Sequence, residues 1–177
     1  MNICVYGAAS DDINKEYIKA GEQLGRIIAK KGHSLVFGGG ACGLMGAAAR
    51  GVYSEGGYIT AVVPSFFNVD GALFEYSNKI VFTETMRERK KNLEEFSDAF
   101  IITPGGIGTF DEFFEIIALR SLERHQKPVA VLNTLGFYDD LLAFIKKVSG
   151  EKFLRANIDD LIFVSDDIEE LLNYISR

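Results

Sequence analysis

The sequence has few of the residues that build metal sites and disulfide scaffolds. Its 177 residues include two cysteines, Cys4 and Cys42, and two histidines, His33 and His125. None of these stands at the spacing of a zinc site, and two cysteines do not make a disulfide framework. Each histidine lies near a lysine or arginine at the end of an expected helix, so we expect both at the surface. A Ser-His or Cys-His hydrolase is therefore disfavoured, and neither a metal ion nor another cofactor is expected.

Long apolar runs and blocks of positive charge are also missing. No apolar stretch approaches the ~20 residues of a membrane-spanning helix, and residues 1–7 resemble the start of a strand rather than a signal peptide. The net charge is −6 with no cluster of Lys and Arg, which argues against a nucleic-acid partner. We therefore predict a cytoplasmic protein with neither membrane nor nucleic acid as partner. A small phosphorylated ligand remains compatible, because it needs only local positive charge.

Apolar segments bounded by glycine and proline alternate with helical patterns along the whole chain. This alternation predicts an α/β, Rossmann-like fold: one domain over residues 1–177, with a mostly parallel sheet of about seven strands and helices on both faces. Residues 64–78 are expected to form a long loop with a short helical turn. The expected strands are 3–6, 34–37, 58–63, 79–83, 99–103, 128–132 and 162–164, and the expected helices are 14–31, 43–55, 86–96, 109–123, 138–148 and 168–176.

A glycine-rich loop follows the second expected strand. Residues 38–43 read Gly-Gly-Gly-Ala-Cys-Gly and contain the spacing G-x-G-x-x-G. A dinucleotide site would also need an acidic residue about 20 positions on, at the end of the next strand, and residues 60–64 contain none. The glycines could instead serve only to let the following small-residue helix pack closely. A P-loop is excluded, because no G-K-[ST] follows either glycine loop.

A second glycine-rich loop follows the fifth expected strand. Gly105, Gly106 and Gly108 permit positive φ and the close approach of a ligand, and Thr109 is predicted to cap the next helix. The N-terminus of a helix presents free N–H groups that suit a phosphate. Strand ends of a parallel sheet meet at one edge, so both loops should lie together where ligands bind in such folds.

Two expected helices carry a charged residue within an apolar face. On the helical wheel, Arg89 falls between Leu93 and Phe96. A buried arginine requires an anionic partner, although a structural ion pair or a snorkelling side chain would also satisfy this pattern. In the helix after the second loop, Glu112 lies within the apolar arc, whereas Asp111 lies outside it.

The inward placement of Glu112 has a chemical consequence. Partial burial would raise the pKa of its carboxyl group, as is typical of catalytic acids and bases. The apolar arc around it is wider than one sheet face requires, and Phe114 extends it further. We therefore expect a second subunit to cover part of this helix.

Both glycine loops belong to longer motifs. Residues 38–46 are similar to G-G-G-x-x-G-L-M-G, and residues 104–112 match P-G-G-x-G-T-x-x-E throughout. On these motifs the chain resembles the LOG ("Lonely Guy") family of cytokinin riboside 5′-monophosphate phosphoribohydrolases, whose members were long labelled possible lysine decarboxylases. The resemblance implies hydrolysis of the N-glycosidic bond of adenosine 5′-monophosphate, with or without an N6 modification, to the free base and ribose 5-phosphate.

The resemblance also implies roles for particular residues. The catalytic arginine and glutamate of the family correspond to Arg89 and Glu112, and the family is dimeric with active sites near the interface. Arg87 stands where the motif M-H-x-R-K has histidine, and residues 64–78 differ from the plant members, so the identity of the base stays open. The implied substrate-binding positions are Gly39, Gly40, Gly43, Met86, Lys90, Gly105, Gly106, Ile107, Gly108 and Thr109.

Two other functions remain as alternatives. A non-catalytic nucleotide-binding or sensor module could use the same fold, since a fold does not determine a function. A lysine decarboxylase would need pyridoxal phosphate bound to a lysine, and no lysine stands beside either glycine loop in the sequence.

Overall fold

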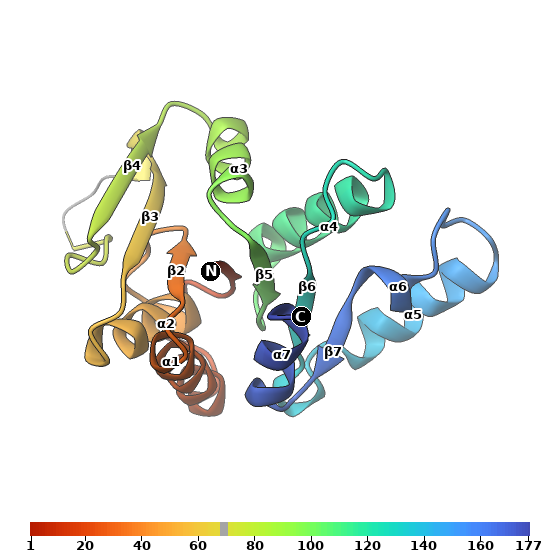
Figure 1. The fold of residues 1–177 in the computed structure, drawn as a ribbon, viewed down its shortest axis with the longest axis horizontal. Coiled ribbons are helices and arrows are strands. Elements are labelled where there is room, and N and C mark those ends of the chain that lie inside the picture. The colour runs from red at the N-terminus through yellow and green to blue at the C-terminus, as the bar shows by residue number, and fades with distance from the viewer. Residues whose placement is uncertain (68–70) are drawn as a thin grey trace.

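The computed structural model describes residues 1–67 and 71–177 and contains one seven-stranded sheet (Figure 1). The strand order is β4-β3-β2-β1-β5-β6-β7, and every neighbouring pair is parallel. This confirms the predicted Rossmann-like α/β fold. The strands are β1 (Asn2–Tyr6), β2 (Ser34–Phe37), β3 (Ile59–Pro64), β4 (Lys79–Thr83), β5 (Ala99–Ile102), β6 (Val129–Leu132) and β7 (Phe163–Ser165).

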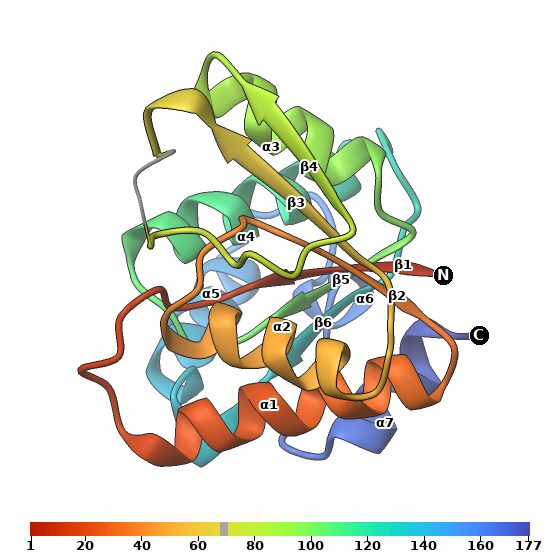
Figure 2. The same ribbon diagram turned by 90° about the vertical axis from the view of Figure 1, so that its left-hand side faces the viewer.

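Helices cover both faces of the sheet, as predicted (Figure 2). One layer consists of α1 (Lys15–Lys30), α2 (Gly43–Ser54) and α7 (Ile168–Ile175), and the other of α3 (Met86–Glu95), α4 (Ile107–Ser121), α5 (Asp139–Gly150) and α6 (Ile158–Leu161). Alternate side chains of each strand point to opposite faces, so the central strands are apolar throughout. In β1, Ile3 and Val5 join the core under α1 and α2, while Cys4 and Tyr6 join the core under α3 and α4.

The first layer depends on close contact between helix backbones. A Cβ atom at Gly25 would collide with the Ala48 carbonyl, and one at Gly51 would collide with the Glu22 carbonyl. The small residues of α2 therefore do allow this helix to pack closely, as one of the two interpretations of its glycines held. Among the described residues, no helix combines the length and the apolar character that crossing a membrane requires.

Most element boundaries agree with the sequence predictions to within two residues. The turn expected in residues 64–78 is the 3-10 helix Ser65–Phe67, whereas residues 68–70 of that loop lie outside the described residues. The short helix α6 and the 3-10 turn Thr134–Gly136 were not predicted. The prediction that Thr109 caps α4 is wrong, because Gly106 is the N-cap and α4 begins at Ile107.

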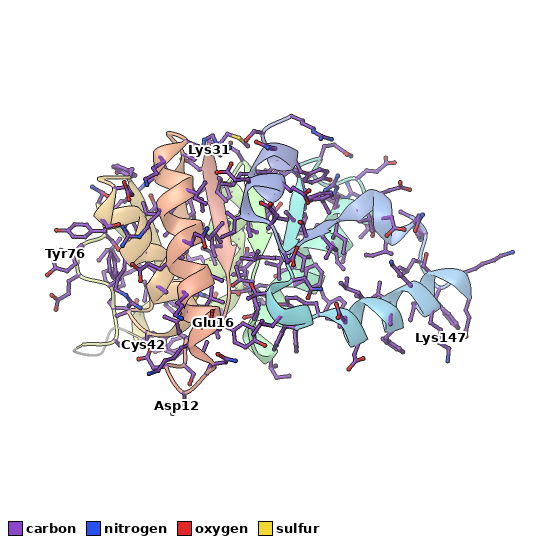
Figure 3. The ribbon with its side chains drawn as sticks, turned by 90° about the horizontal axis from the view of Figure 1, so that it is seen from below. Asp12, Glu16, Lys31, Cys42, Tyr76 and Lys147 are labelled. Carbon is purple, nitrogen blue, oxygen red and sulfur yellow. The ribbon has the colours of Figure 1, made fainter. Side chains whose placement is uncertain are left out.

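The order of the strands reverses its direction between β1 and β5. Backbone hydrogen bonds join the loops at this point. The N–H of Ala8, after β1, donates to the Pro104 carbonyl (3.0 Å), and the Ala8 carbonyl accepts from Met45 N–H of α2 (3.1 Å). The segment after β1 therefore connects the loop after β2 to the loop after β5. Seen from below, the labelled residues Asp12, Glu16 and Cys42 all lie toward this end of the molecule, and Lys31 lies toward the opposite end (Figure 3).

Candidate active site

The side chain of Arg89 extends from α3 towards the edge of the sheet where the strands end. The N-cap of this helix is Thr85, whose hydroxyl accepts from Glu88 N–H (3.1 Å), while the Glu88 carboxylate accepts from Glu84 N–H (2.9 Å). This reciprocal capping fixes the start of the helix. Arg89 is 7% exposed, and its Nε donates to the carbonyl of Val62 in β3 (3.3 Å). The inward position predicted from the helical wheel is confirmed.

Glu112 of α4 is the anionic partner of this arginine. Its Oε1 lies 2.7 Å from Arg89 Nη1, and Glu112 is only 6% exposed. Asp111, in contrast, is exposed, as the sequence predicts. Burial raises the pKa of the Glu112 carboxyl group above its ordinary value, and the charge and hydrogen bond of Arg89 oppose that rise without cancelling it. The site thus holds a carboxylate whose proton affinity is increased.

The N-terminus of α4 lies next to this pair and is open to a ligand. The first N–H groups of a helix, here those of Ile107, Gly108 and Thr109, have no partner within the helix, and Gly106 has no side chain to cap them. Gly106, Ile107 and Gly108 are exposed, whereas Thr109 is buried with its hydroxyl against Gly105. These N–H groups lie where the sequence predicts an anion cradle, which stays a prediction, and Thr109 lies within the helix rather than at its cap.

The N-terminus of α2, after the other glycine loop, is already occupied. The N–H of Gly43 donates to the Asp11 carboxylate (2.8 Å), and this hydrogen bond, with a smaller contribution from Cys42, lowers the pKa of Asp11. A negatively charged side chain thus takes the place that a phosphate would need. Asp11 had no signal in the sequence, since it stands in a loop without a motif. Of the two helix N-termini, the one of α4 is available.

Two neighbouring cavities border Arg89 and the N-terminus of α4, and Ala9 lines both of them. The first, about 360 Å³, is lined by Gly38, Gly40, Met45, Phe67, Leu73 and Arg89. The second, about 510 Å³, lies beside Gly105 and Gly106 and is lined on its other side by Ser10, Tyr17 and Phe137. The aromatic rings of Tyr17 and Phe137 meet edge to face at 5.8 Å. The arginine and the helix N-terminus therefore face neighbouring spaces.

Lys90, which the resemblance implies as a substrate ligand, is engaged by carboxylates of α4. Its Nζ lies 2.8 Å from Glu115 and 3.0 Å from Asp111, and its side chain is 16% exposed. Burial lowers the pKa of the ammonium group, but the hydrogen bonds to Glu115 and Asp111 outweigh this and raise it. The ion pairs therefore keep Lys90 protonated and join α3 to α4.

Of the remaining predicted positions, Gly40 lines the first cavity, whereas Gly39, Gly43 and Met86 are not among its lining residues. Gly39 and Gly43 have positive φ, 84° and 65°, which their residue type permits, and Gly40 bridges to Leu73. Met86 begins α3 and is 37% exposed. The structure thus brings the two glycine loops and both charged residues to one edge of the sheet. Nothing in it assigns a ligand to any of these positions.

The prediction that His125 is a surface residue is wrong. Its ring is 8% exposed, lies against Phe100 with centroids 5.7 Å apart, and places Nε2 3.0 Å from the carbonyl of Ile116. Its Nδ1 has no hydrogen-bond partner among the described residues. Burial lowers the pKa of His125, with the Ile116 hydrogen bond opposing. His33 is half-buried.

The described residues contain no group of three or more His, Cys, Asp or Glu side chains that could hold a metal ion. The groups that the site itself presents are a buried guanidinium, a buried carboxylate and the N–H groups of a helix N-terminus. The chain therefore belongs to the Rossmann-like α/β class, in which ligands bind at the point where the strand order reverses.

Comparison with known proteins identifies the family. The model of the family described as "Possible lysine decarboxylase" matches residues 45–175. The chain is 37% identical over 170 residues to a probable cytokinin riboside 5′-monophosphate phosphoribohydrolase of Oryza sativa subsp. japonica, covering 96% of this chain and 69% of that protein. It is 34% identical over 175 residues to the cytokinin riboside 5′-monophosphate phosphoribohydrolase LOG2 of Arabidopsis thaliana, covering 99% and 82%. The chain belongs to the LOG family.

Solved structures support the same fold. The molybdenum cofactor carrier protein of Chlamydomonas reinhardtii superimposes with a TM-score of 0.75 at 22% identity, over 99% of this chain and 95% of that one. At this level of identity the similarity concerns the fold alone. Proteins that are named for carrying a cofactor and proteins that are named for hydrolysing a nucleotide therefore share this architecture.

Proposed function

We propose that this protein hydrolyses the N-glycosidic bond of adenosine 5′-monophosphate, with or without an N6 modification, to the free base and ribose 5-phosphate. The observation that carries the proposal is the buried pair of Arg89 and Glu112 (2.7 Å) beside the open N-terminus of α4. The names of the curated relatives, at 34–37% identity, point to the same reaction.

The 5′-phosphate would bind at the start of α4. The N–H groups of Gly106, Gly108 and Thr109 would donate to its oxygens, and the positive end of the helix dipole favours negative charge there. Because Gly43 N–H at the N-terminus of α2 is bonded to Asp11, the start of α4 is the better of these two sites for the phosphate. The ribose would then lie between the start of α4 and Glu112, one turn further along.

Glu112 would supply the base catalysis. A carboxylate with a raised pKa accepts a proton from water more readily near neutral pH than an ordinary glutamate does. As the bond between C1′ and the base nitrogen breaks, positive charge develops on the sugar, and the nearby carboxylate stabilises it. Water then adds at C1′ and passes one proton to Glu112. The departing base takes up one proton to leave as the neutral free base, and Glu112 returns to its carboxylate form when it gives up its proton.

Arg89 would take the place of a second acidic group. Glycosidases ordinarily use two carboxylates, and the motif here provides one. The guanidinium carries a permanent positive charge, so it would anchor the substrate and stabilise negative charge on the departing base. The first cavity, which Arg89 lines, is where the base would lie.

The test is release of free base by the wild type and by Glu112→Gln. We expect the variant to lose about 10²–10⁴-fold in kcat, the usual contribution of a general base. Glu123→Gln is the matched control, because it makes the same change at an exposed position just beyond the end of α4. Equal base release by the wild type and Glu112→Gln would contradict the assignment.

A specific observation favours the alternative of a non-catalytic nucleotide-binding or sensor module. Arg89 and Glu112 satisfy each other without a ligand, so the pair could be purely structural. Calorimetry with adenosine 5′-monophosphate separates the two functions. Binding without any base release would support the sensor, whereas turnover supports the enzyme.

The family description as a possible lysine decarboxylase fits the residues less well. Lys90 follows Arg89 directly in the chain, and a lysine must lose its proton before it forms a Schiff base with pyridoxal phosphate. The carboxylates of Glu115 and Asp111 hold this lysine in the protonated form. Lys90→Met should therefore leave any aldimine absorbance that added pyridoxal phosphate produces unchanged.

We also propose that the protein is a homodimer with active sites near the interface. The support is an apolar cavity of about 550 Å³ between α4, α5 and α6, lined by Phe114, Ile117, Phe144, Val148, Leu154 and Leu161. Phe114 and Phe144 are 41% and 62% exposed. A second copy of the chain would cover this surface, which begins on the same helix as Glu112.

A further inference from the structure

The guanidinium of Arg89 lies directly against the backbone of Gly38, the first residue after β2. A Cβ atom at Gly38 would collide with Arg89 Nη2. On its other sides the same guanidinium is held by the Val62 carbonyl at 3.3 Å and by Glu112 at 2.7 Å. Three elements, β2, β3 and α4, therefore surround one side chain of α3.

The backbone conformation does not explain why residue 38 is glycine. Gly39 has a φ of 84° and Gly43 a φ of 65°, so these two positions favour glycine for conformational reasons. Gly38 is not among the glycines with positive φ. The requirement at this position is therefore space, and the atom that needs the space belongs to Arg89.

We propose that Gly38 is a positioning residue for Arg89: its missing side chain creates the slot that holds the guanidinium against Glu112. In this role the glycine loop after β2 serves an arginine of the protein itself rather than the phosphate of a dinucleotide. Gly38 would therefore act on the proposed reaction through the position of Arg89.

Alanine at position 38 would force the guanidinium to move. Arg89 is buried and bonded on two sides, so it cannot swing into solvent without breaking the bonds to Val62 and Glu112. Gly40 provides a matched comparison in the same loop. A Cβ atom there would meet only Met45 Cε at 3.5 Å, an ordinary contact, and its φ is also not positive.

The first test is a stability cycle that does not depend on activity. Gly38→Ala is introduced into the wild type and into the Arg89→Met/Glu112→Gln background, which removes the guanidinium together with its charged partner. We expect Gly38→Ala to lower the urea midpoint of the wild type and to lower that of the background at least threefold less. Gly40→Ala should shift both midpoints equally.

The cycle remains informative if Gly38→Ala does not fold. Folding that is restored in the Arg89→Met/Glu112→Gln background supports the slot, because the colliding group is then absent. Equal shifts in both backgrounds, or loss of folding in both, would overturn the inference, whatever the outcome of the base-release assay.

The second test rests on the proposed function and separates positioning from general destabilisation. Displacement of a catalytic group by about 1 Å costs on the order of 10²-fold in rate, so Gly38→Ala should lower kcat about 100-fold while KM changes little. The NMR titration of the Glu112 carboxyl group should move to higher pH, because its cationic partner has moved away. Gly150→Ala, at a remote position where a Cβ atom meets nothing within 4 Å, should alter neither quantity. An unchanged titration and kcat in a folded Gly38→Ala protein would contradict the positioning role.

Discussion

The ammonium group of Lys90 lies 2.8 Å from the carboxylate of Glu115, one turn along α4 from Glu112. Arg89 and Lys90 are consecutive in α3, and each forms an ion pair with α4. The two helices are thus joined by a buried pair and a more exposed pair side by side. The second pair fixes the position of α3, and hence of Arg89, relative to Glu112.

We expect Lys90→Met to weaken the contact between the two helices. Loss of the ion pairs, which leaves Asp111 and Glu115 close together, should lower the free energy of unfolding by roughly 1 kcal/mol, with KM unchanged. Urea denaturation and steady-state kinetics measure the two quantities. Lys91→Met removes an ion pair with Glu95 that lies on the exposed surface of the same helix. This change should lower the free energy of unfolding less. A raised KM with unaltered stability would instead assign Lys90 to substrate binding, as the resemblance implies.

The rate of base release should depend on the ionisation of Glu112. Its folded-state pKa is raised above 4.5 by burial, so kcat/KM should rise with pH through a limb whose midpoint lies above that value. Arg89 lowers the pKa, so Arg89→Met should raise the NMR titration midpoint of the Glu112 carboxyl group further. A limb at or below 4.5 would show that burial does not dominate, and a lower midpoint in the variant would show that Arg89 does not stabilise the carboxylate.

The burial of His125 predicts a loss of stability in mild acid. Its pKa is lowered in the folded state relative to 6.5, so the unfolded chain takes up the proton first. The free energy of unfolding should therefore fall as the pH decreases below 6.5, towards the pKa of the folded state. His125→Gln removes this contribution while His33 is retained in both proteins. The two stability curves should converge as the pH falls, and parallel curves would contradict the prediction.

The apolar cavity predicts a residue that controls the oligomeric state. Phe144 lines it and is 62% exposed, so Phe144→Glu should convert the proposed dimer into a monomer in sedimentation velocity. Phe153→Glu is the control, since Phe153 is 76% exposed but lies outside that cavity. A wild-type monomer, or dissociation by both variants alike, would remove the support for this interface.

Periodicity was sufficient to find the charged pair. The positions of Arg89 and Glu112 on helical wheels predicted that both point inward, and they do so because the apolar neighbours Leu93 and Phe113 are buried in the same core. The strands of the sheet could be predicted equally well, since they are short apolar runs between glycines. These features follow from local sequence.

One error arose at a helix boundary, and the others arose where long-range contacts decide. Thr109 has the chemistry of an N-cap, but α4 starts earlier, and its hydroxyl packs against Gly105 instead. His125 follows a helix end that the sequence suggests is exposed, yet Phe100 of β5 covers its ring. The hydrogen bond from Gly43 N–H to Asp11 joins residues 32 positions apart. The hydrogen bond from Arg89 to the Val62 carbonyl joins residues 27 positions apart. No sequence pattern marks such bonds.

The burial of the Arg89–Glu112 pair affects how such a protein can change during evolution. Removal of either partner alone leaves an uncompensated buried charge, which typically costs about 3–5 kcal/mol, a large part of the stability of a single domain. A descendant that no longer needs the chemistry therefore cannot easily discard one half of it. Selection for folding alone would preserve both residues after catalysis was lost, so the presence of the pair in a homologue is not by itself proof that the homologue is an enzyme.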